Sequence, residues 1–212
     1  VTTYRNDSGK SNGLMFDREG RLIACEGADY GGRRVSITKK DGSIMSLAEK
    51  IKGNRFNSPN DLSILPNGRI YFTDPRYRGH EPREIDVEGI YFIDTDGTVK
   101  LATDEIHKPN GILISIDTKT AYVASFQFQH SKKRQLVKFS IDSDGTFGDK
   151  EVLFDFGEKR GADGMAMDTE GNIYAAAGAG KDAGIYIFSP IGEHLALLAM
   201  SKIGAVTNCQ FG

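Results

Sequence analysis

The sequence has no tryptophan, only two cysteines and a formal charge of −2 over 212 residues. Cys25 and Cys209 lie in separate strand-like stretches, which favours two small apolar thiols over a disulfide. Proteins that bind phosphate usually carry a basic face, so the weak negative charge argues against a nucleic-acid partner. No apolar run approaches the roughly 20 residues that span a bilayer, so we expect a soluble protein without a membrane segment. The compartment, cytoplasmic or periplasmic/secreted, and the oligomeric state stay open.

What the chain has in quantity is a repeat. An Asn or Asp, a short apolar run, a turn ending in or near Gly and a second apolar run recur along the sequence. The residues that lead the units are 48, 50, 53 and 45 positions apart, and they are Asn12, Asn60, Asn110, Asp163 and Asn208. Periods of about 40 to 50 residues with four strands per unit are typical of β-propeller blades. We therefore predict an all-β protein built of four-stranded antiparallel blades.

The first unit illustrates the strand pattern. Leu14–Phe16 and Arg21–Cys25 flank one Gly-containing turn, and Arg34–Ile37 and Ser43–Leu47 flank a second. Two hairpins of this kind make one four-stranded sheet. The first strands of the units are nearly continuous apolar runs, which predicts that they are the innermost strands. Propellers of the Trp-Asp repeat type are disfavoured because the chain has no tryptophan.

The chain contains four whole units and part of a fifth, which is not a whole number of blades. Whole units begin near residues 12, 60, 110 and 163, and a partial one begins at 207. Propellers close at about four to eight blades. Either four blades close and leave a spare segment, or the chain is an internal part of a longer propeller. We favour the second interpretation, in which residues 1–212 are one incomplete propeller domain.

The leading amides and acids suggest a site. In a propeller every innermost strand runs in the same direction, so the residues that open these strands lie on a ring around one channel mouth. Amide oxygens plus a carboxylate, without His or Cys, form a hard-oxygen set that suits Ca²⁺ rather than zinc. The simpler interpretation, that Asn and Asp merely start turns, stays open. The long polar connection at residues 74–86 is a candidate lid over this end.

Five strings of the sequence resemble one family. They are SPND at 58–61 with YFTDP at 71–75, KPNGI at 108–112, ADGMAMD at 162–168, and TNCQFG at 207–212. Together they are similar to the gluconolactonase, senescence-marker protein and luciferin-regenerating enzyme family. This resemblance covers essentially the whole chain. It implies a six-bladed propeller, of which about four blades are present, with a divalent cation, usually Ca²⁺, at the channel mouth.

The resemblance also implies an activity and roles for individual residues. The expected reaction is the opening of a sugar lactone, a small-molecule substrate. Asn60, Asn110 and Asp163 match metal ligands, and Asp163 also matches the general base. Asn60, Asp74, Arg76 and Tyr77 match positions that line the substrate pocket.

The sequence departs from the family in one respect and leaves two alternatives. The family's remaining metal ligand is a Glu in a blade that would precede Asn12, so we expect this chain alone to bind a metal weakly. A propeller that only binds a partner is one alternative. A lactone or phosphotriester hydrolase of the paraoxonase type is the other. No Ser-His-Asp triad is apparent among the four histidines.

Overall fold

The computed structural model describes residues 3–126, 133–200 and 202–211. These residues form β-strands and a single 3₁₀ helix, η1 at Gly180–Asp182. The chain divides into two compact units, Val1–Asp104 and Glu105–Gly212. Each unit holds two four-stranded sheets in which consecutive strands are neighbours. Each unit is described by itself below.

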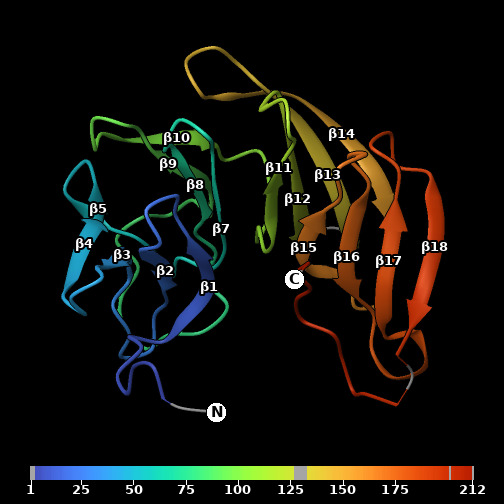
Figure 1. Ribbon diagram of the computed structural model, residues 1–212, viewed down its shortest axis with the longest axis horizontal. Coiled ribbons are helices and arrows are strands. Elements are labelled where there is room, and N and C mark those ends of the chain that lie inside the picture. Colours follow the sequence, from blue (N-terminus) through green and yellow to red (C-terminus); the bar gives the residue numbers. More distant parts are fainter. Residues whose placement is uncertain (1–2, 127–132, 201, 212) are drawn as a thin grey trace. The chain divides into compact units, whose positions relative to one another are not determined.

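Unit 1 contains the first two blades and a small extra hairpin (Figure 1). The first blade is β1 (Ser11–Phe16), β2 (Leu22–Glu26), β3 (Arg34–Thr38) and β4 (Ile44–Ala48). The hairpin is β5 (Lys50–Ile51) and β6 (Asn54–Arg55). The second blade is β7 (Leu62–Ile64), β8 (Ile70–Thr73), β9 (Ile90–Ile93) and β10 (Val99–Thr103). All strand pairs are antiparallel.

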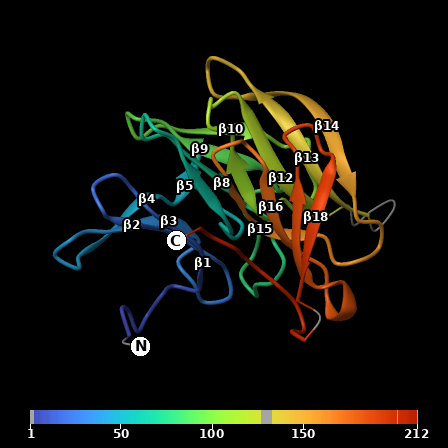
Figure 2. The same cartoon turned by 45° about the vertical axis from the view of Figure 1, so that its right-hand side comes forward.

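Unit 2 repeats the arrangement (Figure 2). The third blade is β11 (Ile112–Ile114), β12 (Thr120–Phe126), β13 (Arg134–Ile141) and β14 (Phe147–Asp155). The fourth is β15 (Ala162–Met167), β16 (Ile173–Ala177), β17 (Gly184–Phe188) and β18 (His194–Ala199). Together with unit 1, this confirms the predicted all-β fold of four antiparallel blades.

The core of each unit lies between its two blades. In unit 1, Ile23 and Val35 of the first blade pack with Phe72 and Tyr91 of the second. In unit 2, apolar side chains of the third and fourth blades pack in the same way, and they include Leu136, Ile173 and Phe188. Apolar burial of this kind is the main force that joins neighbouring blades.

The leading strands of the two blades face each other within each unit, and their place nearest the propeller axis stays a prediction. β1 contacts β7 in unit 1, and β11 contacts β15 in unit 2. The fourth strand of the last blade, β18, is exposed along its whole length. The hairpin β5–β6 and the helix η1 were not expected from the sequence. The number of blades in the whole protein and the assignment of residues 1–212 to one domain stay predictions.

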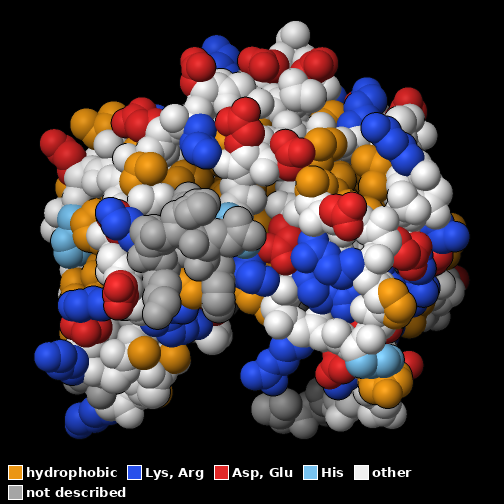
Figure 3. Space-filling view, turned by 180° about the vertical axis from the view of Figure 1, so that it is seen from behind, with side chains coloured by type: hydrophobic (Ala, Val, Ile, Leu, Met, Phe, Trp, Pro, Cys, Tyr) orange, Lys and Arg blue, Asp and Glu red, His pale blue; other side chains and the backbone are white. Residues whose placement is uncertain are grey.

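Three expectations about the surface and the thiols can be compared with the structure. Cys25 and Cys209 are both free. Among the described residues, none of the helices has the length and apolar character needed to cross a membrane. Acidic and basic side chains are interspersed on the face shown in Figure 3, which agrees with the small net charge.

Candidate active site

The residues that lead the blades share one backbone setting. Asn60 N–H donates to the carbonyl oxygen of Thr73 at 2.9 Å, and Asn110 N–H donates to that of Ala124 at 2.8 Å. Each therefore opens an inner strand against the end of the second strand. The register of β1 shifts around Asn12, and that of β15 shifts around Asp163. Such bulges redirect a side chain out of the regular alternation of a strand.

A small residue after the lead brings neighbouring blades together. Gly13 N–H donates to the carbonyl oxygen of Asn60 at 2.7 Å, within unit 1. In unit 2, a Cβ atom at Gly111 would overlap the carbonyl oxygen of Asp163. Within each unit, consecutive leading residues are consequently neighbours at the same end of the inner strands.

Unit 2 assembles the most chemically distinctive group. The Asn110 side-chain amide hydrogen-bonds to the Asp163 carboxylate. Arg160 Nη2 donates to Asp163 Oδ2 at 2.6 Å. The Asn208 amide lies against Gly164, the residue after Asp163 in β15. A Cβ atom at Gly164 would overlap this amide. Asn110, Asp163 and Asn208, which the repeat singled out, are thus brought together.

Burial and the nearby positive charge shift the pKa of Asp163 in opposite directions. Burial raises the pKa of the Asp163 carboxyl above its ordinary value, although the Arg160 charge and the Asn110 hydrogen bond oppose that rise. The Asp163 side chain keeps 24% of its surface exposed. A carboxylate that is partly buried, partly accessible and shifted toward neutral pH is suited to accept a proton.

Arg160 is the functional candidate that the sequence reasoning missed. Its Nη1 donates to the carbonyl oxygens of Val206 at 2.6 Å and Gly178 at 3.3 Å, in addition to the Nη2 bond to Asp163. The one sequence signal is a cation three positions before a leading acid. Its two carbonyl partners come from segments far along the chain, so the sequence pattern did not reveal them.

Unit 1 places Asn60 at the same end of its inner strand. The Asn60 Oδ1 atom is buried and has no hydrogen-bond partner among the residues that the structure describes. A buried amide oxygen without a partner loses its hydration without compensation. Asn60 therefore offers an acceptor that a cation or a donor group on a ligand would satisfy.

Asp74 is held inside unit 1. Its two oxygens accept the backbone N–H groups of Asn57 at 2.8 Å and Ser58 at 2.6 Å, and the residue is fully buried. Burial raises the pKa of Asp74 to about 7, although the two N–H groups and the charges of Arg33 and Arg76 oppose it. Asp74 thus fixes the segment that leads to Asn60. If it affects a substrate, we expect it to do so through that segment.

The connection at residues 74–86 packs on the loop between β2 and β3. Glu81 accepts the N–H groups of Asp29 at 3.1 Å and Tyr30 at 2.9 Å. Arg76 forms an ion pair with Glu81 at 3.3 Å, and its side chain is 8% exposed. Tyr77 is 44% exposed. Of the predicted pocket residues, Tyr77 is thus the more accessible, and a substrate contact for Arg76 or Tyr77 stays a prediction.

The donor set fits a hard cation in type. Among the described residues there is no group of three or more His, Cys, Asp or Glu side chains that could hold a metal. Unit 2 offers the Asp163 carboxylate and the amide of Asn110, which are in contact, and unit 1 separately offers the buried amide oxygen of Asn60. Ca²⁺ takes about six to eight oxygen ligands, including amides and waters, so this set would supply part of a shell. The unpartnered Asn60 Oδ1 supports the fit, whereas Arg160 already occupies one oxygen of Asp163.

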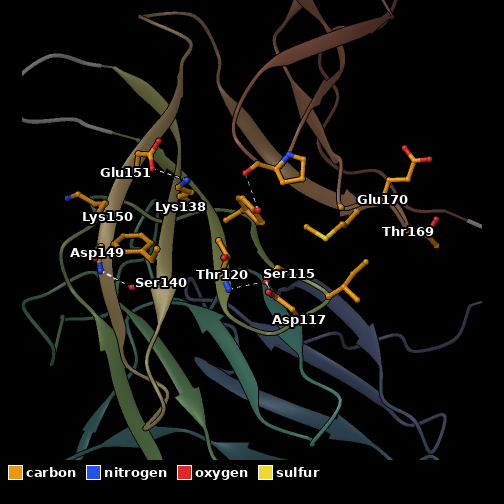
Figure 4. A pocket seen from close by; sticks show the side chains of 16 residues that line it. Ser115, Asp117, Thr120, Lys138, Ser140, Asp149, Lys150, Glu151, Thr169 and Glu170 are labelled. Atoms are coloured by element: carbon orange, nitrogen blue, oxygen red, sulfur yellow. Dashed lines mark hydrogen bonds and ion pairs between the residues drawn. The ribbon is translucent and has the colours of Figure 1, made fainter.

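A large cavity in unit 2 lies away from these residues. It has a volume of about 1000 Å³ and is lined by Ser115, Asp117, Lys138 and Glu170, among others. Ser115 and Asp117 follow β11, whereas Asn110 precedes it, so the cavity is at the opposite end of the inner strands. Polar groups around it pair with one another, including Lys138 with Glu151 at 2.8 Å (Figure 4). We therefore do not assign the chemistry to this cavity.

The known proteins that are similar to this chain include gluconolactonases. Residues 2–212 match the family model described as the SMP-30/Gluconolactonase/LRE-like region. A gluconolactonase of Zymomonas mobilis is 30% identical over 214 aligned positions, which cover 95% of this chain and 58% of that protein. A solved gluconolactonase structure from Xanthomonas campestris superposes with a TM-score of 0.81 at 26% identity, covering 95% of this chain and 65% of that one.

A second similar structure is described as a calcium-binding protein, regucalcin, from Agrobacterium tumefaciens. It has a TM-score of 0.63 at 22% identity and covers 88% of this chain and 59% of its own, which shows a shared fold. The chain thus spans about three fifths of the length of these relatives.

Proposed function

The chain belongs to the SMP-30/gluconolactonase/LRE-like family, and we propose that it forms the larger part of an enzyme that hydrolyses sugar lactones. The observation that carries this proposal is the contact of Asn110 and Arg160 with the partly exposed carboxylate of Asp163. The gluconolactonase of Zymomonas mobilis supports the choice of substrate class. The resemblance implies six blades. Four blades and 65% coverage of the Xanthomonas campestris structure agree with that number.

In the proposed reaction, a water oxygen attacks the lactone carbonyl carbon. Asp163 accepts the proton that this water loses. The bond between the carbonyl carbon and the ring oxygen then breaks, and the proton passes to that oxygen, which leaves a hydroxy acid. The raised pKa of Asp163 brings the carboxylate closer to the ambient pH, where a general base is most effective. Such a base contributes about 10²- to 10⁴-fold in rate.

We propose that Asn60, Asn110 and Asp163 hold a divalent cation, Ca²⁺ being the best match to their oxygens. When bound, the cation would polarise the carbonyl oxygen of the substrate. The chain's own residues orient the site, because Asn110 and Arg160 both hydrogen-bond to the Asp163 carboxylate. Asp74, by holding Asn57 and Ser58, fixes the approach to Asn60.

The test is lactone turnover by the full-length protein. Asp163→Asn keeps the size of the side chain and removes the base, so we expect kcat to fall about 10²- to 10⁴-fold. Asp168→Asn is the matched control, because Asp168 caps the turn at the other end of β15 and should leave kcat unchanged. A chelator should also abolish turnover. Full activity in Asp163→Asn, or after chelation, would reject the mechanism.

The alternatives give different results in the same assay. A propeller that only binds a partner would show no turnover of any lactone. A paraoxonase-type enzyme would prefer apolar lactones or phosphotriesters to sugar lactones. Two substrate panels, hydroxylated and apolar, therefore separate the three possibilities.

A further inference from the structure

Arg160 is anchored independently of the carboxylate it touches. Its Nη1 donates to the Val206 and Gly178 carbonyl oxygens, and only Nη2 reaches Asp163. The Arg160 side chain is 26% exposed, so the guanidinium is partly removed from water. A planar guanidinium with several fixed acceptors loses little further freedom, and it therefore stays where the carbonyls hold it.

A cation fixed in this way has a consequence for a metal ligand. The carboxylate of Asp163 is the sole acid among the ligands that we propose within this chain, so it supplies much of the negative charge that a divalent cation needs. Like charges close together repel strongly where the surroundings are partly buried. Arg160 also holds one of the two carboxylate oxygens, which leaves the other for a metal.

We propose that Arg160 is a positioning residue that opposes the divalent cation. It holds the Asp163 carboxylate in one orientation and lowers the affinity of the site for the metal. The proposal rests on the assignment of Asp163 as a metal ligand in the proposed function. It predicts a site that is filled only at raised cation concentration.

Calcium binding to the full-length protein, measured by isothermal titration calorimetry, tests the idea. Arg160→Gln removes the charge, and we expect the Kd for Ca²⁺ to fall about tenfold or more. Arg160→Lys keeps the positive charge, so its Kd for Ca²⁺ should stay closer to the wild-type value than that of Arg160→Gln. Lys159→Gln removes the same charge from the adjacent residue, which pairs with Asp182 at 3.3 Å. This control should stay within about twofold of the wild type, because the Lys159 side chain is 66% exposed and screened.

Several results would overturn the proposal. One is an unchanged or weaker affinity in Arg160→Gln, and another is an equal gain in Lys159→Gln. The absence of binding in both wild type and Arg160→Gln up to about 10 mM Ca²⁺ would overturn it as well, since weak protein sites bind near 1 mM. If Arg160→Gln does not fold, Arg160→Met keeps the aliphatic stem, removes the charge and gives the same prediction.

A second readout uses the metal-dependent rise in melting temperature. Calcium should raise the melting temperature more in Arg160→Gln than in the wild type, because tighter binding to the folded state stabilises it more. A merely structural role for Arg160 would lower the melting temperature without enlarging this calcium effect. Neither readout needs turnover. A protein that hydrolyses no lactone can still confirm the proposal, and an active enzyme can still fail it.

Discussion

Two carboxylates, Asp74 after β8 and Asp163 in β15, differ in the groups that hold them. Asp74 in unit 1 is fully buried and bonded to two backbone N–H groups. Asp163 in unit 2 keeps part of its surface exposed and is bonded to the side chains of Arg160 and Asn110. The two backbone donors enclose Asp74 within its unit, whereas the side-chain donors to Asp163 leave part of that carboxylate accessible to a ligand. The comparison indicates that Asp74 holds its loop in place, whereas Asp163 is the better candidate for the proton acceptor.

The first prediction tests whether Asp74 titrates as a buried acid. If it does not, the contrast with Asp163 is wrong. The Asp74 pKa is raised from 3.8 to about 7, so between these values the folded state holds a proton that the unfolded state has lost. Its contribution to stability is complete below the unfolded value and is lost as the pH rises through the folded value. Within that window the free energy of unfolding should fall by about 1.4 kcal/mol per pH unit because of this group.

Urea unfolding of the wild type and Asp74→Asn across that window measures the effect as a difference. The variant should lack this slope. It should also lose about 2 kcal/mol at acidic pH, because an amide can accept one backbone N–H but turns its own N–H toward the other. If the free energy of unfolding depends on pH in the same way in both proteins, Asp74 titrates as an ordinary exposed acid.

The next prediction concerns the close approach of blades beside Asp163. A Cβ at Gly111 would overlap the Asp163 carbonyl oxygen, whereas a Cβ at Gly204 would meet none of the described residues within 4 Å. We expect Gly111→Ala to destabilise the protein by about 1 to 3 kcal/mol, as overpacking does. Gly204→Ala, the control in the same unit, should change stability by less than about 0.5 kcal/mol. Equal melting temperatures for the two variants would mean that the inner strands of unit 2 separate easily.

The sequence predicted the blades well because the signals are local. Alternating apolar runs and Gly-containing turns define each hairpin, and the repeat aligns the residues that lead the inner strands. Arg160 was missed because its carbonyl partners, at Val206 and Gly178, depend on how distant segments pack. For Asp74, the sequence showed a polar residue after a strand. It did not show that the carboxylate turns inward onto Asn57 and Ser58.

The smallest effect is expected at Glu81, which lies near the surface and binds the loop between β2 and β3 in unit 1. Asp29 and Tyr30 have left-handed φ angles of 65° and 67°, and Glu81 accepts both of their N–H groups. Burial raises the pKa of Glu81, but its own backbone N–H and those of Tyr30 and Asp29 outweigh this and bring it to about 2. The stabilisation is therefore present above the ordinary value of 4.5 and is lost as the pH falls toward 2, opposite in sign to Asp74.

Glu81→Gln should cost at most about 1 kcal/mol, because the site is close to solvent and one acceptor oxygen remains. The effect should be local, with the amides of Asp29 and Tyr30 exchanging hydrogen about fivefold faster. Glu19→Gln is the control, since Glu19 pairs with Arg21 at an exposed turn. If Glu81→Gln instead speeds exchange throughout both blades of unit 1, the loop contact is part of the core architecture. Glu81 would then stabilise unit 1 as a whole and not only the loop that contains Asp29 and Tyr30.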